Sequence, residues 1–201
     1  MKIAVLGATG QTGRLLVARA VERGHEVTAL VRRPAAAPWS GGVHVVQSDV
    51  AVPESVLDAL AGVDVVLSGL GVAKGQDPQI LSNGAELVVK SGKRVIWLGA
   101  LAAGATAGAL GPVNGWLLSK VLDDWEAKAV ADTAVLAAGG TVVAAGMLTN
   151  KPYQGNGRLV EVPGFRRLLP PRSPRAGIAA LMVAEAERAE FTSRAAVALF
   201  G

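Results

Sequence analysis

The sequence of 201 residues contains no cysteine, which excludes a disulfide framework and a thiolate metal site. It has only two histidines, His25 and His44, which lie far apart with no metal-ligand spacing around either. A metal site is therefore not expected. Because a chain without cysteine suits a reducing compartment, we expect a cytoplasmic protein.

Charged residues are also few. They make up 18% of the chain, against 51% hydrophobic residues, and this balance excludes an intrinsically disordered protein. The length suits one complete α/β domain over residues 1–201. The net charge of +4 is modest and its basic residues are scattered, so no nucleic-acid partner is expected. A basic balance does suit a pocket for an anionic cofactor or substrate.

One long uncharged segment, from Val95 to Ser119, has to be compared with a membrane span. A spanning helix needs roughly 20 mainly apolar residues. This segment is instead rich in alanine and interrupted by several glycines, Pro112 and Asn114. The first apolar run of the chain is only as long as a strand, so no signal peptide is predicted. We expect no membrane association, and a loop beside the ligand after a buried strand.

The most informative segment is residues 2–13, with the sequence KIAVLGATGQTG. Its apolar run stops at Gly7, glycines recur at Gly10 and Gly13, and helical apolar spacing follows from Arg14. Gly7 would permit a tight turn, Gly10 would let the backbone approach a pyrophosphate, and Gly13 would let helix and strand pack closely. The simpler alternative is a turn that merely requires glycine. The order of strand, glycine turn and helix favours dinucleotide binding.

Strands and helices alternate along the rest of the chain. We expect strands at 3–6, 25–31, 43–47, 63–67, 95–98, 141–145, 158–162 and 194–200, and helices at 14–23, 53–60, 77–91, 116–138 and from Ser173-Pro174 to 188. Ser173 is the expected N-cap of the last helix. Near-continuous apolar strands predict a parallel sheet covered on both faces. With the glycine turn, this indicates a single-domain α/β fold of the Rossmann type, a doubly wound sheet, with small substrate-side elements from 146 to 201.

The end of the second expected strand indicates which nicotinamide cofactor binds. An acidic residue there holds the ribose 2′-hydroxyl of NAD, whereas arginine accommodates the 2′-phosphate of NADP. This chain has Arg32 and Arg33 there, and no acidic residue lies between Glu26 and Asp49. The alternative is two exposed arginines on a turn. We prefer NADP(H), with Arg32 as the main contact, because guanidinium matches phosphate in charge and geometry.

The later strand ends complete the expected cofactor site. Asp49 follows the third strand and could accept a hydrogen bond from an adenine amino group, or could equally be a turn or N-cap aspartate. Small residues after the fourth strand would allow the backbone to lie along the ribose and pyrophosphate. The expected cofactor-binding residues are Gly7, Thr9, Gly10, Gln11, Thr12, Gly13, Arg32, Arg33, Asp49, Val50, Ser68, Gly69, Leu70, Gly71, Gly99 and Ala100.

These segments, together with residues 146–150 (GMLTN), resemble the atypical short-chain dehydrogenases/reductases. Within that group the chain is most similar to the NmrA-like proteins, which include flavin and biliverdin-IXβ reductases. The resemblance covers essentially the whole chain, and the glycine spacing is typical of extended and atypical members. It implies a Rossmann fold, NADPH binding at the residues above and hydride transfer to a small substrate.

Two departures from this family separate the chain from conventional alcohol dehydrogenases. Those enzymes use a tyrosine with a lysine four positions later, in which the lysine lowers the tyrosine pKa. Here the only tyrosine is Tyr153, and residue 157 is glycine. The serine expected after the fifth strand is also absent, and Ala144-Ala145-Gly146 stands where relatives often have Arg-Pro-Gly. On the expected long helix, Asp123, Asp124 and Glu126 lie beside Lys120 and Lys128, and this pattern suits surface ion pairs at four-residue spacing.

Reductase chemistry remains compatible with these departures, because a flavin or an activated alkene can accept a hydride and take its proton from water. The catalytic residue is unknown; Lys120 and Tyr153 are weak candidates, and Lys120 is more simply a solvated lysine. Aromatic side chains could stack on a planar substrate or could only fill core. The expected substrate-facing residues are Trp116, Met147, Thr149, Asn150 and Tyr153.

The main hypothesis is an NADPH-dependent reductase of a small planar or conjugated substrate. A non-catalytic NADP(H)-binding sensor of the NmrA-like type is the alternative, and an isomerase or dehydratase would need an acid/base pair that the sequence does not show. The expected partner is a small-molecule substrate, for a monomer or a homodimer.

Overall fold

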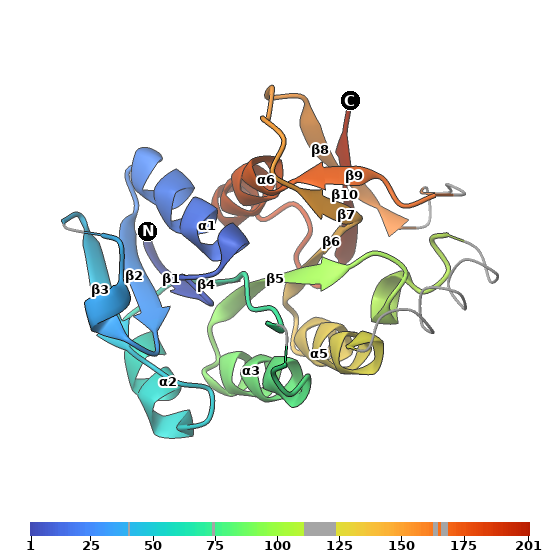
Figure 1. Ribbon diagram of the computed structural model, residues 1–201. Helices are drawn as coiled ribbons and strands as arrows, with labels where there is room; N and C mark the ends of the chain where they lie inside the picture. The colour runs from blue at the N-terminus through green and yellow to red at the C-terminus, as the bar shows by residue number, and fades with distance from the viewer. Residues whose placement is uncertain (40, 74, 111–123, 163–164, 166–168) are drawn as a thin grey trace.

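A single mixed sheet forms the centre of the molecule in the computed structural model, which describes residues 1–39, 41–73, 75–110, 124–162, 165 and 169–201 (Figure 1). Its neighbouring strands are parallel, except that the last one pairs antiparallel with its neighbour. In spatial order the strands are β3 (Val43–Gln47), β2 (Glu26–Val31), β1 (Lys2–Leu6), β4 (Val65–Ser68), β5 (Arg94–Ala100), β6 (Thr141–Ala145), β10 (Ala195–Phe200) and β8 (Gly157–Glu161).

The strand order confirms the predicted Rossmann-type fold. The chain builds outward from β1 to β2 and β3, then crosses back to β4 on the other side of β1. This reversal is the topological switch point, and ligands of such sheets bind there, beyond the carboxyl ends of the strands. The loops that leave β1 and β4 therefore frame the expected ligand position.

Helices cover both faces of the sheet (Figure 1). Helices α1 (Gln11–Glu22) and α6 (Arg175–Arg188) pack together on one face, and α2 (Pro53–Leu60), α3 (Gln79–Lys90) and α5 (Trp125–Ala137) cover the other. None of the described helices combines the length and apolarity needed to cross a bilayer.

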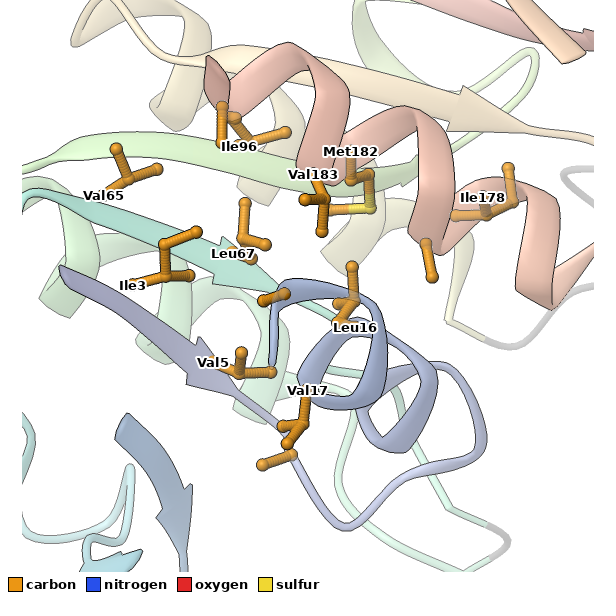
Figure 2. Close-up of a cluster of buried hydrophobic side chains, with 14 of the residues drawn as sticks. Ile3, Val5, Leu16, Val17, Val65, Leu67, Ile96, Ile178, Met182 and Val183 are labelled. Carbon is orange, nitrogen blue, oxygen red and sulfur yellow. The ribbon is translucent and has the colours of Figure 1, made fainter. Parts of the chain in front are cut away.

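The core between α1, α6 and the sheet positions the first helix. Figure 2 shows Leu16 of α1 facing Met182 and Val183 of α6, while Val17 lies on the side of α1 beside Val5, with Ile3 also among the strand residues of this cluster. These side chains are at most 1% exposed. Since full burial of one such side chain contributes about 1.5–3 kcal/mol, this cluster fixes α1, and with it the glycine turn, against the sheet.

Most expected elements lie where the sequence places them, but the start of α6 is a correction. Ser173 is not its N-cap: it belongs to β9 (Arg172–Pro174), which pairs with β7 (Met147–Thr149), and neither short strand was predicted. The Ser173 hydroxyl accepts a hydrogen bond from the Gly146 N–H at 3.1 Å. Pairing with β7 keeps the backbone extended through Pro174 (ψ 126°), so the helix begins at Arg175.

A buried carboxylate holds the turn between α6 and β10. Glu185 is 3% exposed and accepts hydrogen bonds from the backbone N–H groups of Glu190 and Phe191 at 3.2 and 3.0 Å. The Arg94 guanidinium and the Thr141 hydroxyl also donate to it, each at 3.4 Å. This network joins α6 to the amino ends of β5 and β6.

Replacing Glu185 with glutamine is expected to destabilise the protein by about 2 kcal/mol, because it removes a charged acceptor and turns an amide NH₂ toward existing donors. Urea denaturation measures the loss. The exposed Glu190→Gln is the matched control and should change stability little. Equal stabilities for the two variants would contradict the proposed role of Glu185.

Candidate functional site

The turn from β1 into α1 is shaped by two glycines. Gly7 has a φ of +73°, and a Cβ on it would lie 2.9 Å from the backbone N and Cα of Leu70. A Cβ on Gly13 would lie 2.0 Å from the Gly7 carbonyl oxygen. The tight turn predicted at Gly7 and the close packing predicted at Gly13 are both confirmed. The Gly10 N–H donates to the Gly7 carbonyl at 3.0 Å and closes the turn.

The amino terminus of α1 is open to solvent and uncapped. Its N-cap is Gly10, no side chain caps the helix, and its first turn contains no acidic residue. Thr9, Gly10 and Gln11 are exposed. An exposed helix N-terminus with free N–H groups and no competing carboxylate is suited to bind a phosphate. Arg14, which the sequence analysis did not single out, donates from Nε to the Thr9 carbonyl at 2.9 Å and braces this turn.

The loop after β4 packs against the glycine turn and forms the second side of the expected cofactor site. Its Gly69 N–H donates to the Leu6 carbonyl at 3.0 Å, and a Cβ on Gly69 would lie 3.2 Å from the Gly13 backbone N. Ser68 is fully buried, and its hydroxyl accepts the Leu70 N–H at 3.3 Å. Since the Ser68 side chain is used within the protein, this loop can offer a ligand only its backbone and the side chains after it.

Two arginines stand at the end of β2, directly beside β1 in the sheet. Arg32 and Arg33 are exposed, and neither guanidinium bonds to a described residue. Asp49 follows β3, the next strand at this edge of the sheet. One of its carboxylate oxygens accepts the Ala51 N–H at 3.0 Å, which is the role of a turn aspartate, one of the two roles expected for Asp49 from the sequence. Val50 is buried and packs in the core beside α2.

A buried acid lies against the end of β5, and sequence reasoning missed it. Asp132 of α5 is fully buried, and a Cβ on Gly99 would lie 2.7 and 2.9 Å from its two carboxylate oxygens. Neither oxygen has a hydrogen bond of good geometry within the described residues. Burial raises the Asp132 pKa to about 7, although the Ala100 N–H, the Lys128 charge and the Trp97 indole lie near enough to lower it in part. The sequence signal was an aspartate within the apolar run AVADTAVLA.

An ion pair lies at the start of α5. The Lys128 ammonium lies 2.9 Å from Asp124 Oδ1 and 2.8 Å from Oδ2. The pair has the four-residue spacing expected from the sequence, but its side chains are only 28% and 19% exposed, so it is partly buried rather than a surface pair.

The predicted substrate-facing residues are only partly described. Met147 is 54% exposed on β7, and Asn150 accepts a hydrogen bond from Arg175 at 2.9 Å. Tyr153 packs edge-on against Phe200 with ring centroids 5.8 Å apart, and its hydroxyl accepts the Gly157 N–H at 3.2 Å. These contacts give Tyr153 a structural role and leave its catalytic role a prediction. The Thr149 hydroxyl is buried without a partner among the described residues, and Trp116 and Lys120 lie outside them.

Two small cavities lie away from this site. One, of about 90 Å³, lies at the amino ends of β5 and β6, next to Gly92 and Gly139. The other, of about 100 Å³, lies between α1 and α6 beside Arg19 and Glu187. Neither reaches the glycine turn at the carboxyl ends of the strands, so neither is taken as the ligand site.

The strand order, the switch point and the uncapped glycine turn define a nucleotide-binding domain of the Rossmann type. A model of the NAD(P)H-binding family matches residues 7–189, and the chain belongs to this family. The resemblance to atypical short-chain dehydrogenases/reductases is thereby confirmed. The family establishes NAD(P)H as the cofactor class without separating NADP from NAD.

Two solved structures share the fold, and curated relatives share part of the sequence. The oxidoreductase ylbE from Lactococcus lactis is 19% identical, with a TM-score of 0.83 over 100% of this chain and 91% of that one. ChuY, an anaerobillin reductase from Escherichia coli O157:H7, is 17% identical, with a TM-score of 0.80 over 100% of this chain and 97% of that one. The photosystem II assembly factor Ycf39 from Cyanophora paradoxa is 42% identical over 69 residues, which are 33% of this chain and 22% of Ycf39. The chain spans about a fifth of the length of the first curated relatives that it matches, between 17% and 22%.

Proposed function

We propose that this protein is an NADPH-dependent reductase of a small planar or conjugated acceptor, of the flavin, quinone or enone type. The observation that carries the proposal is the uncapped N-terminus of α1 together with two arginines at the end of β2 whose guanidinium groups have no partner among the described residues. The first suits the pyrophosphate of a dinucleotide, and the second suits the ribose 2′-phosphate that distinguishes NADPH from NADH.

The groups at this edge of the sheet would suit the separate parts of a dinucleotide. The backbone N–H groups of Gln11 and Thr12 would hold the pyrophosphate, because the first turn of α1 has no side-chain cap and no acidic side chain, whereas the Gly10 N–H already donates to the Gly7 carbonyl. Arg32 would hold the 2′-phosphate, with Arg33 next to it. Gly69 and Gly71, after β4, would leave room for the cofactor along the switch point. When bound, the cofactor supplies the hydride.

The acceptor would lie beyond the ends of β5 and β6. Met147 of β7 offers an exposed apolar surface there. A pocket with apolar walls and few polar groups suits a flat conjugated molecule. The similarity to ylbE and ChuY supports reductase chemistry by analogy of fold.

A non-catalytic NADP(H) sensor is the second candidate. The absent tyrosine–lysine pair favours it, because conventional members need that pair as proton donor. The local similarity to Ycf39, an assembly factor, points the same way. A sensor would work through a partner protein, whereas the reductase works on a small molecule as a monomer or a homodimer.

Cofactor consumption separates the two candidates. NADPH oxidation is followed by absorbance with FMN, quinones and enones as acceptors, and NADPH binding is measured by calorimetry. We expect micromolar binding and turnover with at least one acceptor class. Tight binding without turnover on any acceptor would establish the sensor, and the absence of any binding heat would rule out both.

Replacing Arg32 with alanine is expected to weaken NADPH binding by about 30-fold and NADH binding by less than about threefold, because one charge-assisted phosphate contact is lost. Calorimetry with both nucleotides measures the difference. Arg188→Ala is the control, since Arg188 is an exposed arginine on α6. Equal losses for NADPH and NADH would remove the assignment of the 2′-phosphate to Arg32.

A further inference from the structure

Helix α1 and its C-cap carry three arginines, and two of them are neutralised by a carboxylate. Arg19 forms an ion pair with Glu22 at 2.7 Å. Arg23, the C-cap, forms one with Glu187 of α6 at 2.8 Å. Arg14, the fourth residue of the helix, forms no ion pair with a described residue. Its positive charge is therefore available to a ligand.

One side-chain hydrogen bond holds Arg14 over the glycine turn. Its Nε donates to the Thr9 carbonyl at 2.9 Å. A helical side chain leans toward the amino terminus of its helix and covers the preceding turn. Because the guanidinium is planar and rigid, this bond fixes the direction of the whole group. Neither Nη atom donates to a described residue, so both face the uncapped start of α1 or the solvent beside it.

The backbone of this turn offers few donors to a diphosphate. The Gly10 N–H already donates within the turn, and Gly13 is buried against Gly69 of the loop after β4. The N–H groups of Gln11 and Thr12 remain. They and the helix dipole supply only partial positive charge, whereas both phosphates of a pyrophosphate are ionised. A full positive charge beside the turn would complete the site.

The charge pattern around Arg14 suits this role. The sequence from Gly7 to Val21 contains no acidic residue that could compete for the guanidinium. The other unpaired arginines described at this edge of the sheet, Arg32 and Arg33, lie at the end of β2. Positive charges at separate positions suit a ligand that carries phosphates at separate positions.

We propose that Arg14 is a cofactor-binding residue: its Nη groups bind the pyrophosphate of the nicotinamide dinucleotide, and its Nε holds the turn in shape. The proposal deepens the cofactor-binding part of the proposed function and rests on it. A guanidinium suits this task because it is always charged and can donate two parallel N–H groups to one phosphate. Since NADPH and NADH share the pyrophosphate, Arg14 sets the affinity for both, and Arg32 sets the preference between them.

Calorimetry with NADPH and NADH tests the assignment without any turnover. Arg14→Ala is expected to weaken the binding of both nucleotides by about 30-fold, because one charge-assisted phosphate contact is lost in each complex. This loss should shrink by about threefold when NaCl is raised from about 0.05 to about 0.5 M, since salt screens the charge pair in the wild-type protein. Arg19→Ala is the matched control on the same helix and should bind both nucleotides like the wild-type protein.

A second variant keeps the test valid if Arg14→Ala folds poorly. Arg14→Lys keeps the positive charge but replaces the rigid fork by a single ammonium, so a loss of about fivefold for both nucleotides is expected, with the salt dependence of the wild-type protein. Urea denaturation of the nucleotide-free proteins measures the structural part. The exposed bond from Nε to the Thr9 carbonyl should contribute about 1 kcal/mol to the free energy of unfolding.

The outcomes separate this proposal from the function beneath it. If the wild-type protein binds both nucleotides and Arg14→Ala binds them equally tightly, this proposal is overturned and the reductase function stands. A loss for NADPH alone would assign Arg14 to the 2′-phosphate, and equal losses that do not change with salt would make it only a brace of the turn; either result overturns the proposal.

The reductase function can also fail while the proposal holds. If the wild-type protein binds NADPH but reduces no acceptor, the reductase function fails, and the binding ratios of the Arg14 variants still decide the role of Arg14. If the wild-type protein binds neither nucleotide, both fail together.

Discussion

Replacing Gly13 with alanine is expected to abolish dinucleotide binding and to destabilise the fold. The added Cβ would lie 2.0 Å from the Gly7 carbonyl oxygen and 2.9 Å from the Ala8 Cα, closer than non-bonded atoms can approach. Both neighbours are backbone, so no side chain can rotate away. Either α1 moves off the sheet, which opens the core around Leu16, or the glycine turn deforms. We expect such overpacking to lower the free energy of unfolding by about 3 kcal/mol.

Calorimetry with NADPH and chemical denaturation measure the two effects of Gly13→Ala. Gly62→Ala is the matched control, because a Cβ there meets nothing within 4 Å and the residue follows α2 away from the turn. The control should bind NADPH like the wild-type protein. A Gly13→Ala protein that binds NADPH normally would show that the turn is not held as the structure describes.

Replacing Asp132 with asparagine is expected to flatten the pH dependence of stability. The pKa of Asp132 rises from 3.8 when unfolded to about 7 when folded, so the folded state binds more protons between these values. Stability therefore falls as pH rises from about 4 to about 7, and the full penalty, on the order of 4 kcal/mol, is present above pH 7. Asparagine is neutral throughout and removes this slope.

Urea denaturation at a series of pH values compares the two proteins. Other groups titrate in the same range, and Glu187, whose pKa is lowered mainly by its hydrogen bond to Arg23, contributes stability that is lost as pH falls. Because both proteins share these groups, the difference between their curves isolates Asp132. Parallel curves from pH 4 to pH 8 would show that Asp132 is ionised in the folded protein and pairs with a donor after all.

Local signals in the sequence predicted the elements that depend on them. Helix α2 has the predicted bounds of Pro53–Leu60, because proline suits a first helical turn and the apolar spacing ends before Gly62. The turn at Gly7 and the close packing at Gly13 were predictable for the same reason: only glycine has the conformational freedom and the small size that they need. The alternation of expected strands and helices then predicted the fold class.

Contacts between distant segments could not be predicted in this way. The start of α6 was wrong because Ser173 pairs across to β7, far away in the sequence, and no local pattern reports that pairing. Asp132 was missed for a similar reason. Its burial depends on Gly99 and the short helix η2 (Gly104–Thr106), which reach α5 only in the folded chain. As cofactor contacts, all the expected residues stay predictions, the glycines included, since the structure tests only how the glycine turn is built and exposed side chains such as Arg32 are placed by their ligand.

The contact between α1 and α6 joins two helices that are far apart in the sequence, so α6 is synthesised long after α1. Because a nascent chain emerges from its amino end, the glycine turn leaves the ribosome long before Ile178 and Met182 exist to support the helix that follows it. We therefore expect affinity for the nucleotide only after α6 has been synthesised, and a polypeptide shortened before α6 would contain every glycine of the turn without the helix that supports it.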